Sequence, residues 1–100
     1  MTKEEEIYLY SNPEKVKRIA NKKFGKGNYE LKISTRKNKK YMIRGDFTDD
    51  KWVHFGLWGM EDYTKHNDKM RRELFLNRNH EWQHRKQDTP AYLSYFLLWN

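Results

Sequence analysis

The sequence contains no cysteine, and its 100 residues include only two prolines and five glycines. The absence of cysteine excludes a disulfide framework and any zinc site built on thiolates, and it fits a reducing compartment. No apolar run approaches the roughly 20 residues that a membrane-spanning helix requires. The first ten residues, MTKEEEIYLY, are acidic and lack the basic start and long apolar centre of a signal peptide. These features predict a soluble intracellular protein that has no membrane partner.

Hydrophobic residues are also scarce, at 36% of the chain, whereas 16% of the residues are aromatic. A chain of this length forms one domain with a single modest core. Four Trp and seven Tyr side chains must therefore supply much of the buried area. We expect residues 1–100 to form one basic domain, in which residues 1–11 are either a flexible segment or a docking segment.

Basic charge is concentrated in one part of the chain. The formal net charge is +7, and residues 14–44 contain twelve Lys or Arg and two acids, which gives this segment a net charge of +10. Residues 45–100 contain eight basic and nine acidic side chains, so their net charge is −1. A positive field of this density favours a polyanionic partner. The alternative is a solvated surface that keeps a small domain soluble.

Residues 11–25 predict an amphipathic helix with a cationic face. Ser11 or Asn12 can cap this helix, Pro13 suits its first position, and Gly25 can end it. The apolar residues of its inner face, at helical spacing, are Val16, Ile19, Ala20 and Phe24. The opposite face carries a stripe of three basic residues, which are Lys15, Arg18 and Lys22. Such a stripe is suited to contacting the phosphates of a nucleic acid.

Three short runs of strand-forming residues follow, at 29–34, 40–44 and 51–56, and their short connections favour an antiparallel meander. The first connection is a candidate phosphate-binding turn whose four cations are Arg36, Lys37, Lys39 and Lys40. A charged hairpin that discourages aggregation is the alternative. Tyr41 and Trp52 either stack on the bases of a single strand or belong to the core.

The remaining residues predict short helices that pack aromatic side chains on the sheet. Residues 68–79 predict a helix in which Arg71 and Arg78 fall among the apolar residues. An unpaired buried charge is costly, so we expect one of these arginines to pair with Asp62 or Asp68. The alternative is an external phosphate site. A short helix that starts at Pro90 and the terminal LLWN close the core.

Two groups of residues could indicate an enzyme. Residues 80–84 read HEWQH, which matches the zinc-binding pattern H-E-x-x-H. The context is polar, with Trp82 as its one apolar residue, and no third ligand is apparent, so we attribute the match to chance. The second interpretation is a small nuclease in which His54, His66, Asp68 and Glu73 hold Mg²⁺, but their spacing matches no nuclease motif. We expect no catalytic residue, no metal and no cofactor.

Several motifs together resemble one protein family. They are STRKNKKYMI (34–43), KWVHFG (51–56), EDYTKHND (61–68), the following RR and FLNRN, and the terminal LLW, with NPEKVKRIANKKFG towards the N-terminus. The combination is similar to that of small basic proteins of unassigned function encoded by giant and other large DNA viruses, with shorter relatives in phages. Met60 and Phe75 depart from the family, where Tyr is frequent. The resemblance implies a viral origin and a role near packaged or replicating DNA.

The sequence thus predicts an α+β domain with an N-terminal helix, a three-stranded antiparallel sheet and short C-terminal helices. The predicted function is sequence-nonspecific binding of nucleic acid, with viral DNA favoured, through the basic helix and the basic turn. A virion structural or protein-interaction module is the alternative, with a second copy or a virion protein as partner. The expected location is the host cytoplasm or nucleus, or the virion.

Overall fold

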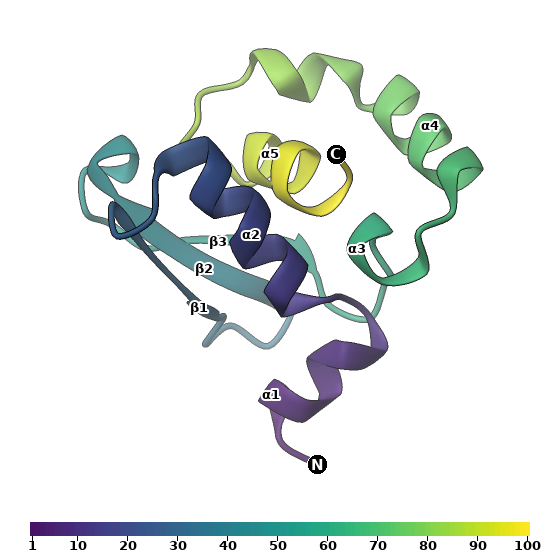
Figure 1. Cartoon of the computed structure of the whole chain (residues 1–100), viewed down its shortest axis with the longest axis horizontal. Coiled ribbons are helices and arrows are strands. Elements are labelled where there is room, and N and C mark those ends of the chain that lie inside the picture. Colours follow the sequence, from purple (N-terminus) through teal and green to yellow (C-terminus); the bar gives the residue numbers. More distant parts are fainter.

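The computed structural model describes all residues, 1–100, and forms a three-stranded antiparallel sheet in the order β1-β2-β3 (Figure 1). In chain order the elements are α1 (Lys3–Glu6), η1 (Ile7–Leu9), α2 (Pro13–Phe24), β1 (Tyr29–Ile33), β2 (Lys39–Gly45), η2 (Asp46–Thr48), β3 (Val53–Leu57), α3 (Tyr63–His66), α4 (Lys69–Arg78), η3 (His80–His84), α5 (Pro90–Leu93) and η4 (Ser94–Leu98). The η segments are short 3-10 helices, except for η4, which is π-helical. The predicted α+β fold is confirmed.

Local signals explain where α2 begins and ends. The side chain of Asn12 accepts a hydrogen bond from the backbone N–H of Lys15, and Pro13 occupies the first turn. Gly25 ends the helix with a φ of +89°, a conformation that glycine adopts without strain. Val16 and Ala20 are buried on the inner face. The helix therefore starts, stops and faces the core as its sequence predicts.

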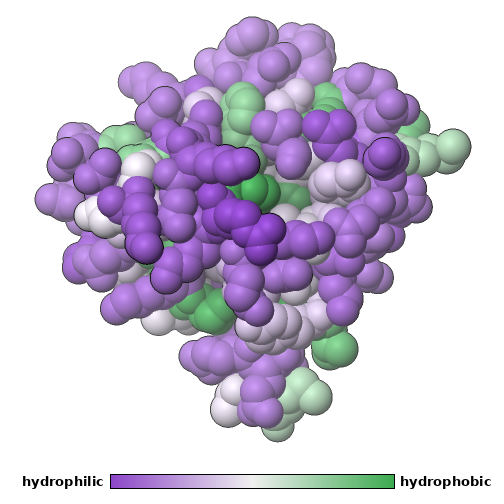
Figure 2. Space-filling model, viewed as in Figure 1, coloured by the Kyte–Doolittle hydropathy of each residue, from purple (hydrophilic) through white to green (hydrophobic).

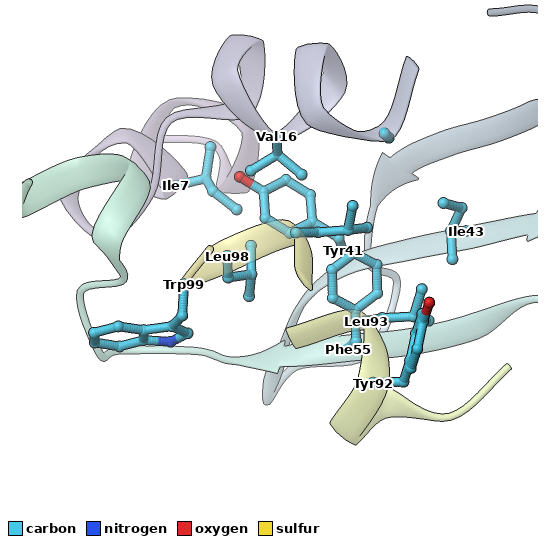
Figure 3. Close-up of a cluster of buried hydrophobic side chains, with 11 residues drawn as sticks. Ile7, Val16, Tyr41, Ile43, Phe55, Tyr92, Leu93, Leu98 and Trp99 are labelled. Carbon is cyan, nitrogen blue, oxygen red and sulfur yellow. The ribbon is translucent and has the colours of Figure 1, made fainter. Parts of the chain in front are cut away.

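The core lies between one face of the sheet and the helices α2, α5 and η4 (Figure 3). In the strand register Tyr41 is opposite Phe55, and Ile43 is opposite Val53. Side chains alternate between the faces of a strand, so these four share one face. That face packs on α2 and on the C-terminal helices, of which α5 contacts β3.

The N-terminal segment is helical. The side chain of Thr2 caps α1, and η1 follows directly, with Ile7 fully buried. The Nζ atom of Lys3 donates hydrogen bonds to three backbone carbonyls at the β1–β2 turn, at distances of 2.6 to 2.9 Å. This contact attaches α1 to the sheet.

The C-terminal helices enclose aromatic side chains. The chain runs from α3 through α4 and η3 in an arc around α5 and η4 (Figure 1). Phe75 of α4 stacks on Trp99, with ring centroids 4.1 Å apart and nearly parallel planes, and Trp82 meets the edge of Phe75. Leu97, Leu98 and Trp99 are buried, so the end of the chain closes the core as predicted. None of the helices has both the length and the apolar character needed to cross a membrane.

Candidate nucleic-acid interface

The outer face of α2 carries exposed cations that have no acidic partner. Arg18 and Lys22 are exposed, and neither takes part in an ion pair. Lys15 lies nearer to α3, and its Nζ atom donates a hydrogen bond of 3.0 Å to the neutral amide oxygen of Asn67. Hydrophilic side chains cover most of the face of the molecule that α2 crosses (Figure 2). All three predicted cations therefore keep a positive charge that no carboxylate neutralises.

The β1–β2 turn is a second cationic element, and it lies beside α1 (Figure 1). Arg36 and Lys37 are exposed, and Lys39 is half-buried. The ammonium group of Lys3, which bonds the turn's carbonyls, adds a positive charge that the sequence did not reveal. Burial and the surrounding cations, Arg36 foremost, hold the pKa of His54 below its ordinary value. The turn is thus a region of positive potential.

Lys40 does not belong to this cationic surface, and its prediction as a phosphate-binding residue is corrected. Its side chain is only 2% exposed, and its Nζ atom forms an ion pair of 3.0 Å with the fully buried carboxylate of Asp62. Burial lowers the pKa of Lys40, and the charge of Asp62 opposes this effect. The first residue of the predicted basic strand is therefore a structural cation.

A chain of buried hydrogen bonds extends from this ion pair. The hydroxyl of Tyr41 donates to Ser11 at 2.7 Å, Ser11 contacts the hydroxyl of Thr64 at 3.2 Å, and Thr64 donates to Asp62. Burial raises the pKa of Tyr41 far above its ordinary value. Because Tyr41 is buried and bonded in this way, it is not available to stack on bases, and that alternative is excluded.

The sequence did not predict this network of hydrogen bonds, because its members are far apart along the chain. The one residue that could have indicated the network is the glycine at position 56, which adopts a φ of +82°. A Cβ atom there would lie 2.9 Å from Leu98 and 3.1 Å from the Cβ of Lys40. Only glycine leaves room for the Lys40 side chain at this position.

Arg71 and Arg78 are exposed and form no ion pair, so the predicted internal pair with Asp62 or Asp68 is wrong. Lys40 takes Asp62, and Asp68 accepts backbone hydrogen bonds from Met70 and Arg71 as the cap of α4. Of the three apolar residues that we expected to be buried, Met70 and Leu74 point outward and are 72% and 57% exposed. The third, Phe75, packs against the core as expected, together with Leu76. The two arginines are therefore free cations at the surface.

The sheet face away from the core carries a further group of charged and aromatic side chains, which we call the open sheet face: Glu30, Lys32, Met42, Arg44, Trp52 and His54. The guanidinium of Arg44 lies 4.6 Å from the centre of the Trp52 ring. It also donates two hydrogen bonds to Glu30, at 2.7 and 2.9 Å. Trp52, the other residue proposed for base stacking, directly precedes β3 and is half-buried beside a cation.

The residues of the two enzyme interpretations are not brought together. HEWQH forms the 3-10 helix η3, in which positions four apart do not share a face as they do in an α-helix. His80 and His84 are exposed. His54 contacts the hydroxyl of Ser34, and His66 accepts a hydrogen bond from the backbone of Asp68. No three His, Asp or Glu side chains are grouped so that they could hold a metal ion.

A pocket of about 390 Å³ lies between the end of β3 and the helices α4, η3 and α5. Its lining is mostly apolar and includes Leu57, Phe75, Trp82 and Trp99. Leu57 and Met60 at the pocket are exposed. The volume falls within the range of small-molecule sites, but few polar groups converge there to select a ligand.

Comparisons with known proteins give one result. No curated protein and no solved structure matches the chain. A family model does match, over residues 29–79, from the start of β1 to the end of α4, and this is half of the chain. The model describes a family of unknown function. The chain belongs to this family of unknown function, DUF5754.

Proposed function

We propose that the protein binds nucleic acid without sequence specificity, through the exposed cations of α2 and of the β1–β2 turn. One observation carries the proposal. Three Lys or Arg side chains form ion pairs in the whole molecule, Lys32, Lys40 and Arg44, and none of them belongs to α2 or to the exposed turn residues. The exposed cations of those two elements are therefore free to neutralise an external polyanion.

Binding would follow from phosphate neutralisation. Each Lys or Arg that contacts a phosphate releases condensed counterions, so affinity falls as the salt concentration rises. The α2 residues in this role are Lys15, Arg18 and Lys22, and those of the turn are Arg36, Lys37 and Lys39. Arg71 and Arg78 of α4 provide further exposed charge. The resemblance to proteins of large DNA viruses supports viral DNA as the ligand, in the host cytoplasm, the nucleus or the virion.

The experiment is a salt titration of binding to duplex DNA, single-stranded DNA and RNA. We expect the slope of log affinity against log salt to be about −0.9 per phosphate contact on a duplex and about −0.7 on a single strand. The double variant Arg18→Glu/Lys22→Glu should flatten the duplex slope by about two units. Both residues are exposed, so the fold should be unaffected.

The matched control is Lys65→Glu/Lys86→Glu, which changes the net charge equally at two exposed residues outside α2 and the turn. We expect a smaller change in slope from this variant. Equal slopes for the two variants would place the contacts elsewhere. Absence of binding to every nucleic acid at low salt would contradict the proposal and favour the alternative, a virion structural or protein-interaction module. For that alternative, the apolar pocket beside Leu57 and Met60 is the specific observation.

A further inference from the structure

The open sheet face consists of two rows of side chains that cross the strands. In the register Glu30 is opposite Arg44, Lys32 is opposite Met42, and Met42 is opposite His54. Continuing this register places Trp52 beside Arg44. The rows are separated by two residues along each strand, or about 7 Å. The helices α2, α5 and η4 pack on the opposite face.

Trp52 is the one Phe, Tyr or Trp of the open sheet face, and the charged groups of two cations lie over its ring. The guanidinium of Arg44 and the ammonium of Lys32 lie 4.6 and 5.7 Å from the centre of its ring. Glu30 contacts both cations, at 2.7 Å for Arg44 and 4.0 Å for Lys32. Arg44 and Lys32 nevertheless remain 39% and 59% exposed. A half-buried ring beneath two accessible cations combines the two groups that bind a base and its phosphates.

We infer that the open sheet face binds unpaired bases, so that single-stranded nucleic acid is the preferred ligand of this protein. This inference rests on the proposed function and specifies its substrate class. A base takes the place of the charged groups of Lys32 and Arg44 over the Trp52 ring and stacks there, and the two displaced cations contact the phosphates on either side of it. A duplex cannot use this surface in the same way, because its bases are already stacked on one another and a ring fixed on a sheet cannot enter that stack.

The surroundings of the open sheet face favour a polyanion over an apolar protein segment. The rows lead along β1 and β2 to the β1–β2 turn, where Arg36 and Lys37 are exposed. His54 stands between Trp52 and the turn, and the positive charges around it help to lower its pKa. A strand that stacks on Trp52 and continues past His54 therefore reaches the turn's free cations. The turn belongs to the proposed phosphate-binding set, so one ligand can contact both.

The test compares a labelled oligothymidylate of about ten nucleotides with a duplex of equal length, by fluorescence anisotropy at low salt. We expect Trp52→Leu to weaken binding of the single strand roughly tenfold, which is the size of effect that one stacked base provides, and binding of the duplex less than twofold. Trp52→Tyr keeps an aromatic ring and should restore most of the affinity. Far-UV circular dichroism shows whether each variant is folded.

Two further variants make the result decisive. Trp82→Leu is the matched control, since it makes the same change in η3, next to the apolar pocket, and it should leave both affinities unchanged. Glu30→Gln removes the one acid of the open sheet face, and it should strengthen single-strand binding a few-fold. Loss of single-strand and duplex binding to equal extents in Trp52→Leu, or no loss from that variant, would overturn the inference while the proposed function stands. Failure of the unmodified protein to bind any nucleic acid contradicts both.

Discussion

At the scale of single residues, the buried pair of Lys40 and Asp62 predicts a large effect on stability. Replacing Lys40 by Met leaves the Asp62 carboxylate buried without its cation. Breaking a buried pair in this way costs about 3 to 5 kcal/mol. We therefore expect the Lys40→Met variant to lose that much free energy of unfolding, measured by urea denaturation.

The neighbouring lysine provides the control for this prediction. Lys39 is half-buried and forms no ion pair, so Lys39→Met should change the free energy of unfolding by no more than about 0.5 kcal/mol. The double variant Lys40→Met/Asp62→Asn removes both charges and should recover part of the loss. Similar stabilities for the two single variants would show that the pair is not needed for folding.

A second residue-scale prediction concerns pH. Burial, with a contribution from the charge of Arg71, lowers the pKa of His66 below its ordinary value of 6.5. Its Nδ1 atom accepts a hydrogen bond from the backbone of Asp68, and its Nε2 atom is buried without a partner. Protonation of Nδ1 would break the hydrogen bond. The unfolded chain takes up the proton first as the pH falls below about 6.5, so stability is lost below that pH.

The check is the thermal midpoint measured between pH 7.5 and pH 5. We expect His66→Asn, whose side-chain oxygen can still accept the hydrogen bond, to show a smaller decline in midpoint than the unmodified protein. Part of the decline remains, because the pKa of His54 is also lowered by burial. His80→Asn is the control, since His80 is exposed, and it should follow the unmodified curve. An identical decline in His66→Asn would mean that His66 does not couple protonation to folding.

At the scale of elements, α2 was predictable and the orientation of α4 was not. The limits of α2 depend on Asn12, Pro13 and Gly25, which act within one or two turns of the helix. The direction that α4 faces depends on Trp99, which lies far along the chain and stacks on Phe75. Apolar residues on several sides of α4 gave no clear inner face, so the sequence alone could not exclude that Leu74 was buried.

The orientation of α4 leads to a prediction about its arginines. Arg71 and Arg78 are exposed and unpaired, so replacing either by Met should shift the free energy of unfolding by no more than about 0.5 kcal/mol. Urea denaturation checks this, with Lys40→Met as the contrasting variant. A loss of several kcal/mol from either replacement would restore the internal pair that we first expected. A loss of DNA affinity without loss of stability would extend the proposed interface to α4.

The candidate site shows the same limit on prediction. The position of Lys15, Arg18 and Lys22 on α2 could be predicted because it follows from helical spacing alone, while their contact with nucleic acid stays a prediction. Lys40 was assigned with the other cations of the turn, and only the fold shows that it faces Asp62. For Trp52 the sequence did not decide between stacking on bases and a place in the core, because periodicity does not say which face of a sheet remains uncovered. Local charge is thus visible in a sequence, whereas long-range pairing is not.

At the scale of the whole molecule, the core is assembled from three separate parts of the chain. Its eleven buried residues include three from the segment 29–79 that matches the family model: Tyr41, Ile43 and Phe55. The other eight lie before or after that segment, in η1, α2, α5 and η4 and at Trp99. The matched segment therefore contains the whole sheet but little of what covers it.

We expect a fragment of residues 29–79 to remain unfolded by itself, because its sheet would expose the apolar face that α2 and the C-terminal helices cover. Far-UV circular dichroism and a urea titration test this, with the full chain as the reference for cooperative unfolding. Adding the segments 1–28 and 80–100 as separate peptides should restore structure if their role is to cover the sheet. A cooperative transition in the fragment alone would show that the sheet is stable without them.

The Lys40–Asp62 pair also limits how this family can diverge. A lineage that replaces one member first must pass through a chain with a stranded charge, and the cost is a large part of the stability of a small domain. The two positions therefore depend on each other although more than twenty residues separate them. The pair can be replaced without loss of stability only when both codons change together or when a compensating substitution is already present. The exposed cations of α2 carry no such constraint, because each can be exchanged singly. Divergent relatives should accordingly keep the pair as a unit while their basic faces vary.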